Sequence, residues 1–596
     1  MAPSPLANAG GVVKFDIKVA GQTISNECEV VSIEISYSVN RINTATIIFS
    51  DGNMPEAKFP VSDSDTFLPG GEIIVQAGYD EDLTEIFSGI IVKHSVKISG
   101  ANQARLIVEC KDKAIAMTTG RKNANYIDKK DSDIINALIG NYAGLSSEVT
   151  ATGYQHKELV QFYCSDWDFM LARAEANGML VILDAGKVSV APPRVSGEPV
   201  LTVTYGSDLI DFNAELDARH QFSSVTTNGW DLATQQLVQQ TAAPEALTSQ
   251  GNVASAELTK VLSLSEYRLQ STTPQDTSAL AAWAKAQQLK SALARIRGHI
   301  IFQGSALAKP GLLIALAGVG ERFNGNAFIS AVHHSLINGN WTTRAEFGMH
   351  PNWFTENNQL ESPLAAGLNA GINGLHIGTV MKLDADPESE HRVQVSIPEM
   401  SAETDGFWAR LTNFYSSNSF GAFFIPEVGD EVVLGFFNDD PSHPVILGSL
   451  YSSKNAPPYA LAAENNTKAI VTRTKMKMEF DEEKKNITII TPGANKIVIS
   501  DDGKSILLQD QNDNKVTLDS AGITLDSPKD ITLKAQGKIV MTAGSNIEAT
   551  AKMDIKQTGL NITNTANIGF TAKGSATAEV SAAGTTTIKG AMVMIN

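Results

Sequence analysis

Residues 523–556 read ITLDSPKD ITLKAQGK IVMTAGSN IEATAKMD IK, and this stretch decides the fold of the C-terminal part of the chain. Isoleucine recurs every eight residues, at Ile523, Ile531, Ile539, Ile547 and Ile555. A second apolar residue usually follows two places later, at Leu525, Leu533, Met541 and Ala549. Turn-forming residues such as Gly, Pro, Ser and Asn lie between the pairs, so each unit of this repeat is one short strand and one turn.

Each octet has too few residues to enclose a core within its own chain. Apolar residues at positions i and i+2 of a strand share one face, so each unit buries one face and leaves the other in water. Three chains wound about one axis supply the missing neighbours, with strand edges paired between chains. The sequence therefore predicts an intertwined trimeric β-helix, or β-prism, over residues 481–596. Its predicted trimer core is Ile523, Ile531, Ile539, Ile547, Ile555, Leu525, Leu533 and Met541.

The same apolar pair continues on both sides of the octets. Upstream it recurs at looser spacing, at Ile487/Ile489, Ile497/Ile499, Ile506/Leu508 and Val516/Leu518. Downstream the register slips by one residue and runs through Ile562, Phe570, Ala578, Thr586 and Met594. Ala, Thr and Gly dominate from Thr571 to Gly590, which predicts a rod that tapers toward the carboxyl end. The alternative is an unstructured low-complexity tail, but such tails lack a regular apolar pair.

The rest of the chain is predicted to be mainly β with a few helices. Alternating strands over residues 12–115, punctuated by Gly, Asn and Asp, indicate an antiparallel barrel or sandwich, and strands resume over 300–347. Between these alternatives we assign two β-barrels with helical insertions to residues 1–370. Helices are predicted at 134–142, 167–177 and 277–297. A linker rich in Gly and Ala follows at 365–374, and residues 452–480 are a second predicted linker. Residues 376–451 fit an OB-fold barrel, with candidate strands at 377–383, 392–397, 407–411, 422–425, 431–437 and 445–450.

The composition and net charge of the chain limit the classes of molecule that it is expected to bind. The 596 residues include 47 Lys+Arg and 65 Asp+Glu, a formal net charge of −18. This balance disfavours nucleic acid and anionic membranes, both of which need cations to replace counterions. The three cysteines (Cys28, Cys110 and Cys164) are too few and too widely spaced for a disulfide framework or a CxxC metal site, and are predicted to be buried thiols. Residues 1–10 hold no secretory signal and no apolar run is long enough to span a membrane, which predicts synthesis and assembly in the cytoplasm.

The barrel carries a long family-specific motif. Residues 424–451 read FIPEVGDEVVLGFFNDDPSHPVILGSLY, and a strand with Trp408 precedes them. This stretch resembles the VgrG spike proteins of type VI secretion systems and of related phage-tail-like contractile injection systems. The segments at 109–114 and 161–169 are similar to the hub domain of the same family. The barrel motif residues that carry the resemblance are Trp408, Pro426, Gly429, Asp430, Glu431, Gly435, Pro444 and Gly448.

The resemblance implies a homotrimer that acts mechanically. Its hub would sit on the tail tube and baseplate proteins, and contraction would drive the spike through the target envelope to deliver effector cargo. A PAAR-like tip protein would cap a platform formed by Met592, Val593, Met594, Ile595 and Asn596. The protein would leave the cell as part of the injection particle.

No catalytic, cofactor-binding or metal-binding residues are predicted. His333 and His334 are adjacent on a predicted strand and should point to opposite faces, so they cannot chelate one metal. Asp510, Asn512 and Asn514 resemble the start of a calcium loop, but Lys515 stands at its sixth position and Ala521 at its twelfth, which predicts a polar turn instead. Two other functions stay open at this point: a phage-type tail lysin with cell-wall hydrolase activity, and a trimeric adhesin fibre.

Overall fold

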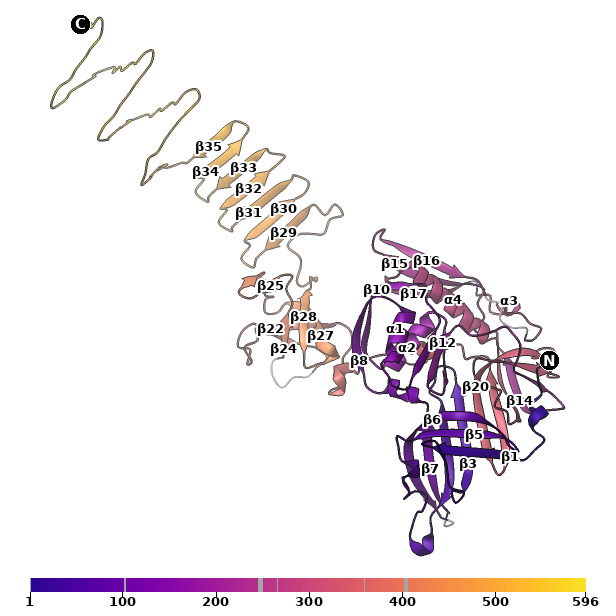
Figure 1. Ribbon diagram of the computed structural model, residues 1–596. Helices are drawn as coiled ribbons and strands as arrows, with labels where there is room; N and C mark the ends of the chain where they lie inside the picture. Colours follow the sequence, from indigo (N-terminus) through magenta and orange to yellow (C-terminus); the bar gives the residue numbers. More distant parts are fainter. Residues whose placement is uncertain are drawn as a thin grey trace. The chain divides into compact units, whose positions relative to one another are not determined.

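The computed structural model describes residues 2–100, 103–244, 250–264, 266–358, 360–400 and 406–595. The chain divides into two compact units, residues 1–449 and 450–596 (Figure 1). The first unit holds the hub strands, the helices and a small closed barrel, and the second holds one antiparallel sheet followed by extended chain. Within the described ranges, no helix is long and apolar enough to cross a bilayer.

Thirteen strands of the hub form one sheet. In β4 (Thr44–Asp51) every second residue is buried, as expected for a strand with one face on a core. The long strand β20 (Gly325–Ile337) pairs with β21 (Asn340–Phe347) on one side and with β3 (Val30–Ser38) on the other. This shared strand joins what the sequence predicts as two barrels into one continuous sheet around two separate cores. Its other strands are β1 (Val13–Val19), β2 (Gln22–Thr23), β5 (Glu72–Tyr79), β6 (Asp82–Ser99), β7 (Gln103–Lys111), β13 (Leu201–Thr204), β14 (Leu209–Leu216), β18 (Ile296–Gln303) and β19 (Leu313–Ala317).

The three predicted helices are confirmed, but the one predicted at 134–142 spans Asp131–Gly140 and the third ends early. The helix α2 (Asp166–Ala176) begins where Ser165 Oγ accepts a hydrogen bond from the Asp168 backbone N–H at 3.1 Å, a standard N-cap. The helix α4 (Thr277–Leu293) ends before the predicted residue Arg297, because Ile296 pairs with Leu216 and starts strand β18. The other helices are α1 (Asp131–Gly140), α3 (Ser255–Leu258) and α5 (Phe354–Asn357), with 3-10 turns at Pro5–Asn8, Met54–Glu56, Asp65–Phe67, Lys113–Thr118, Leu364–Gly367 and Phe437–Asp439.

Three small sheets accompany these helices in the hub. One is a two-stranded ribbon, another joins two antiparallel strands to a parallel third, and the last packs on α4. Their strands are β8 (Lys122–Lys130) and β10 (Gln155–Cys164); β9 (Ser146–Val149), β11 (Leu180–Asp184) and β12 (Lys187–Ala191); and β15 (Val225–Asp231), β16 (Gln236–Ala242) and β17 (Tyr267–Pro274).

The small barrel closes with five strands in the order β22-β23-β24-β28-β27. The predicted strand at 422–425 is wrong: that segment follows a short hairpin, and Pro426 both lacks an N–H and restricts the residue before it. The barrel strands are β22 (His376–Lys382), β23 (Val393–Ser396), β24 (Phe407–Leu411), β27 (Glu431–Phe436) and β28 (Pro444–Ser449), and the hairpin is β25 (Ser416–Ser417) with β26 (Phe420–Gly421).

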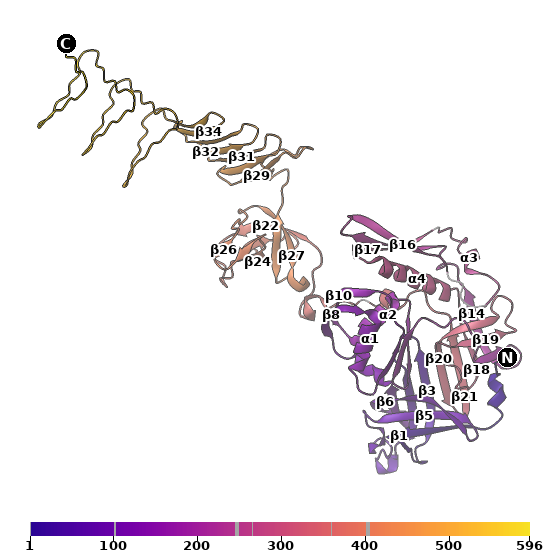
Figure 2. The same ribbon diagram turned by 45° about the horizontal axis from the view of Figure 1, so that its top comes forward.

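Seven five-residue strands form the sheet of the second unit, each antiparallel to the next (Figures 1 and 2). They are β29 (Thr467–Val471), β30 (Lys477–Asp481), β31 (Asn486–Ile490), β32 (Lys496–Ser500), β33 (Ser505–Gln509), β34 (Lys515–Asp519) and β35 (Gly522–Asp526). Two predictions are corrected here. The sheet starts inside the predicted linker at 452–480, and the loosely spaced apolar pairs form a ladder within one chain. Residues 527–595 form no strand or helix in the described chain.

The prediction of three buried thiols is only partly right. Cys110 is buried on β7, whereas Cys28 and Cys164 are half-buried. Cys28 lies in a turn before β3, and Cys164 lies at the end of the two-stranded ribbon β8/β10; both pack at the margin of a hydrophobic core.

Candidate functional site

The sheet β29–β35 carries an apolar face that no described residue of its own unit covers. The strand register aligns the apolar pairs into two columns that run across the sheet. The columns are Met478, Ile489, Ile497, Leu508, Val516 and Leu525, and Phe480, Ile487, Ile499, Ile506, Leu518 and Ile523. The first column from Ile489 to Leu525, together with Ile531, lines a groove of about 580 Å³. An apolar surface of this extent marks an interaction site.

The apolar columns stay exposed in one chain. Ile489 in β31 is 44% exposed, and Ile523 in the last strand, β35, is 74% exposed. The central residues of the other face are mixed: Glu479, Thr488 and Thr517 are polar, whereas Val498 and Leu507 are apolar. The sheet thus has one mixed face and one face that is apolar along both columns.

The predicted trimer-core residues fall into two groups. Ile523 and Leu525 lie in β35 and pair with Leu518 and Val516. The six others lie in the extended segment after β35, all of them more than half exposed: Ile531, Leu533, Ile539, Met541, Ile547 and Ile555. One chain therefore brings the first two together and leaves the rest apart, and their place in a trimer core stays a prediction.

The predicted tip is also apolar and uncovered. Met592, Met594 and Ile595 are largely exposed, and Val593 is about half exposed. Asn596 lies outside the described residues. The use of these residues as a platform for a tip protein stays a prediction.

The barrel motif consists of residues that shape the barrel. Gly429 has φ +91°, a conformation that favours glycine, and its N–H donates to the Val380 carbonyl at 2.8 Å. Asp430 Oδ2 accepts from the Glu427 N–H at 2.9 Å and fixes the turn before β27. Pro444 is the first residue of β28, where proline is tolerated.

The other motif residues lie on the barrel strands themselves. Trp408 lies in β24 opposite Gln394, Glu431 and Gly435 lie in β27, and Gly448 in β28 pairs with Val433. The motif thus explains the closed barrel, and these side chains contain no catalytic arrangement such as a nucleophile with its base.

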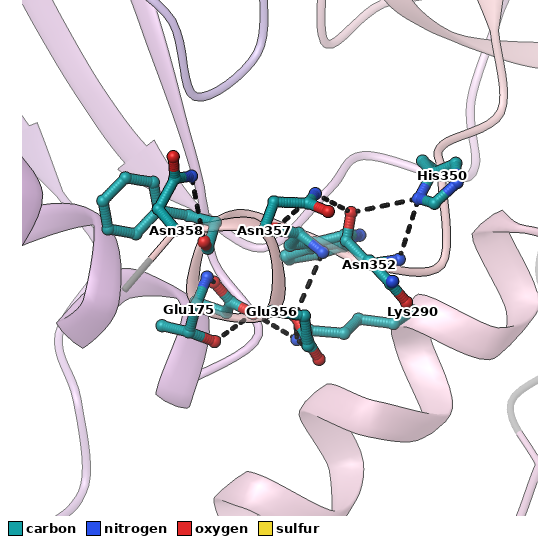
Figure 3. Close-up of polar contacts among 10 residues, drawn as sticks. Glu175, Lys290, His350, Asn352, Glu356, Asn357 and Asn358 are labelled. Carbon is teal, nitrogen blue, oxygen red and sulfur yellow. Dashed lines mark hydrogen bonds and ion pairs between the residues drawn. The ribbon is translucent and has the colours of Figure 1, made fainter. Parts of the chain in front are cut away.

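Sequence reasoning missed a buried ion-pair cluster in the hub (Figure 3). Lys290 on α4 is almost fully buried and pairs with Glu175 of α2 and with Glu356 of α5, the latter at 2.8 Å. Glu175 also accepts hydrogen bonds from the backbone N–H and the hydroxyl of Thr355, each at 2.9 Å. The cluster ties the segment 349–358 to two helices that are distant in sequence. Nothing in the local pattern around Lys290, in an Ala- and Gln-rich helix, signals this role.

Burial governs the titration of this cluster. It raises the pKa of Glu175, whose charged form loses water. Burial also opposes ionisation of Glu356, but hydrogen bonds from Glu175 and Lys290 outweigh it, so the pKa of Glu356 is lowered. With one cation for two carboxylates, Glu175 is the group that takes up a proton first on acidification. Lys290 Nζ also lies 5.4 Å from the ring centroid of Trp353.

The histidine and calcium-loop predictions agree with the structure. His333 Nδ1 is 2.8 Å from Ser36 Oγ, whereas His334 points to the opposite, buried face, where Nδ1 is 3.0 Å from Thr343 Oγ1. Burial lowers the pKa of His334 to about 3, which keeps it neutral. Asp510 caps the turn between β33 and β34 by accepting backbone hydrogen bonds. The described residues contain no group of three or more His, Cys, Asp or Glu side chains that could hold a metal ion.

Known proteins match the barrel and the sheet. Residues 376–451 match the type VI secretion system/phage-baseplate injector OB domain, and residues 486–546 match the phage baseplate V C-terminal trimerisation domain. The type VI secretion system spike protein VgrG3 of Vibrio cholerae serotype O1 is 33% identical over 95 residues, which cover 15% of this chain and 9% of that protein. The spike protein VgrG1c of Pseudomonas aeruginosa is 29% identical over 87 residues, which cover 14% of this chain and 12% of that protein.

These matches confirm the resemblance to the VgrG spike-protein family, although they span only about a tenth of the length of these relatives. Among solved structures, the 43 kDa tail protein of prophage MuSo2 from Shewanella oneidensis aligns with a TM-score of 0.43 at 12% identity, covering 57% of this chain and 98% of that one. The longest family match lies in the hub. Residues 9–338, more than half of the chain, match the Alg8 N-terminal domain, and the chain belongs to this family.

Proposed function

We propose that this protein is the central spike and hub of a contractile injection system and that it works as a homotrimer. The uncovered apolar face of β29–β35 carries this proposal, because it continues without a break into the octets after Asp526. The trimerisation-domain match over residues 486–546 supports three as the number of chains. One chain of such a trimer would supply one third of the prism, and its inner apolar face would be uncovered.

The extended segment 527–595 gives an independent reason for assembly. Its backbone N–H and C=O groups form no ladder in one chain. Buried backbone groups without partners cost free energy, so this segment can bury its isoleucines only if neighbouring chains supply the hydrogen bonds. Folding of this segment is then inseparable from trimer formation.

The mechanism that follows is mechanical. Residues 1–370 would form the hub on the tail tube and baseplate, residues 376–451 the barrel, and residues 467–596 the needle. Axial load from contraction would pass through the barrel into a rod whose chains are held together by backbone hydrogen bonds, and the rod would pierce the target envelope. The apolar residues 592–595 would seat a PAAR-like tip protein, and effectors would travel with the particle.

We also propose that the chain itself is not an enzyme, that it is made in the cytoplasm, and that it leaves the cell within the particle. The similarity of residues 376–451 and 486–546 to an injector OB domain and a baseplate trimerisation domain supports this view. The lysin and adhesin alternatives have no specific observation in their favour.

Light scattering coupled to size-exclusion chromatography tests the trimer. The expected mass is three times the chain mass of 63.7 kDa, about 191 kDa. A well-folded monomer at micromolar concentration would contradict the proposal. Particle-dependent delivery should be lost when residues 527–596 are deleted, whereas the same cells should keep delivery when the full chain is restored.

A further inference from the structure

A cavity of about 990 Å³ opens in the hub, at the upper end of the roughly 300–1,000 Å³ of ligand sites. It lies where the turn after β3, helix α2, strands β18 and β21 and the segment 349–358 meet. This cavity is separate from the needle and the barrel, and no part of the proposed spike function uses it.

The lining of this cavity is basic, in a chain whose net charge is −18. Three arginines line it, Arg41, Arg297 and Arg344, against one carboxylate, Glu346. Arg41 is exposed in the turn after β3 and has no ion pair with any residue that the structure describes. Its N–H donors are therefore available to an anion that enters the cavity.

The two other arginines are only partly engaged. Arg344 Nη2 is 3.6 Å from Glu346, and Arg297 Nη2 pairs with Glu215 at 2.6 Å and Asp217 at 3.2 Å. In both, the Nε–H has no hydrogen-bond partner in the described part of the chain. These Nε–H groups are buried, so a ligand would be met by the other N–H donors of each guanidinium that its ion pair does not use.

One wall of the cavity is held rigidly. Trp353 is 4% exposed, and the cluster of Lys290, Glu175 and Glu356 fixes the segment that carries it (Figure 3). Trp167 of α2 adds a second aromatic side chain to the lining. Rigid walls lower the entropy cost of binding.

We propose that this cavity binds a carboxylate, carried either by an acidic peptide segment or by a small organic acid. The planar fork of a guanidinium matches the two oxygens of a carboxylate, and three such groups line this cavity. A long polyanion such as nucleic acid does not fit, because the cations are few and lie within an acidic chain. The site would exist whether or not the chain acts as a spike.

Isothermal titration calorimetry on the full-length protein tests this site with two probes, the peptide acetyl-Glu-Glu-Glu-amide and free glutarate. We expect Arg41→Glu to weaken binding at least tenfold and Arg344→Gln to weaken it severalfold. Lys97→Glu is the matched control, since Lys97 is an exposed cation on β6 outside the cavity, and it should leave the affinity unchanged. Binding should also shift the tryptophan emission, because Trp167 and Trp353 line the site.

The two probes identify the source of the carboxylate. Binding of the peptide alone assigns the site to an acidic peptide, and equal binding of glutarate assigns it to a small acid. The proposal is overturned if neither probe binds, or if Arg41→Glu leaves the affinity unchanged. Arg41 lies in an exposed turn, so this variant remains informative even if Arg344→Gln disturbs the sheet.

Discussion

The two halves of the needle carry the same apolar pair but use it differently. In residues 467–526 the strands start ten or nine residues apart up to Lys515, and each strand pairs with the next one in its own chain. In residues 527–595 the pair recurs about every eight residues, and no strand forms within the chain. An apolar pair thus predicts a buried face in both halves, but it does not say which chain supplies the neighbouring strand.

Turn length differs between the two halves. Ten- and nine-residue units leave five or four residues outside a five-residue strand, enough for a turn with its own hydrogen bonds, such as the one capped by Asp510. An octet leaves three residues. A three-residue hairpin loop commonly places glycine at a left-handed position, and Ser527-Pro528-Lys529 offers none. A short turn alone does not decide the partner, because β34 and β35 pair within one chain across only two residues, 520–521.

Breaking the shared face should have the largest effect. Leu508→Asp places a charge in the apolar column, and we expect loss of the trimer. The expected cost exceeds the roughly 2–5 kcal/mol per chain of a Leu→Ala change, because the charge must also be buried. Leu507→Asp is the matched control on the opposite face of the same strand. Light scattering should give a monomer for the first variant and a trimer for the second; a trimer in both would contradict the assignment of the faces.

Hydrogen exchange on the Leu508→Asp variant should distinguish the two halves directly. Amides of 467–526 away from the substitution should keep part of their protection, because their ladder lies within one chain. Amides of 527–595 should exchange at least tenfold faster than in the trimer. Equal protection of both halves in the dissociated variant would show that the octets pair within one chain after all.

A smaller change in the octets should affect only the assembled protein. We expect Ile547→Ala to destabilise the trimer by about 2–5 kcal/mol per chain, as for other buried truncations. Val540→Ala is the control, since Val540 lies between Ile539 and Met541 and therefore on the other face of its octet. Thermal unfolding followed at two protein concentrations should show the shift for Ile547→Ala alone; similar shifts for both variants would refute the predicted inward face.

The smallest expected effect concerns the turn between β33 and β34. Hydrogen bonds from Asn514 and Asn512 lower the pKa of Asp510 from its ordinary value near 3.8 to about 2. Because the folded value is the lower one, this contribution to stability is present above about pH 4 and is lost as the pH falls toward 2. Asp510→Ala should flatten that acid-induced decline when thermal unfolding is measured across this range. An unchanged slope would mean that the turn does not contribute.

The sequence predicted the features that rest on local spacing. The octets, the barrel motif and the capped helix α2 each follow from residues close together in the chain. The start of the sheet at Thr467 was not predicted, because the first rung pairs Lys468 with Phe480 and so lacks a complete apolar pair. The Glu175–Lys290–Glu356 cluster was also missed, since its members meet only through tertiary packing. Contacts between residues that are far apart in the chain produce no repeating pattern in a single sequence.

The self-paired sheet also sets an order of events for building the needle. Each newly made chain can form the sheet β29–β35 before it meets another chain. Three preformed sheets would then dock through their apolar columns. The octets can begin to form hydrogen bonds only after that encounter. Strand pairing between the chains then proceeds octet by octet from Gly522 toward the carboxyl end. Initiation thus depends on protein concentration, whereas closure is a fast intramolecular event, and the point of the needle is the last part to form.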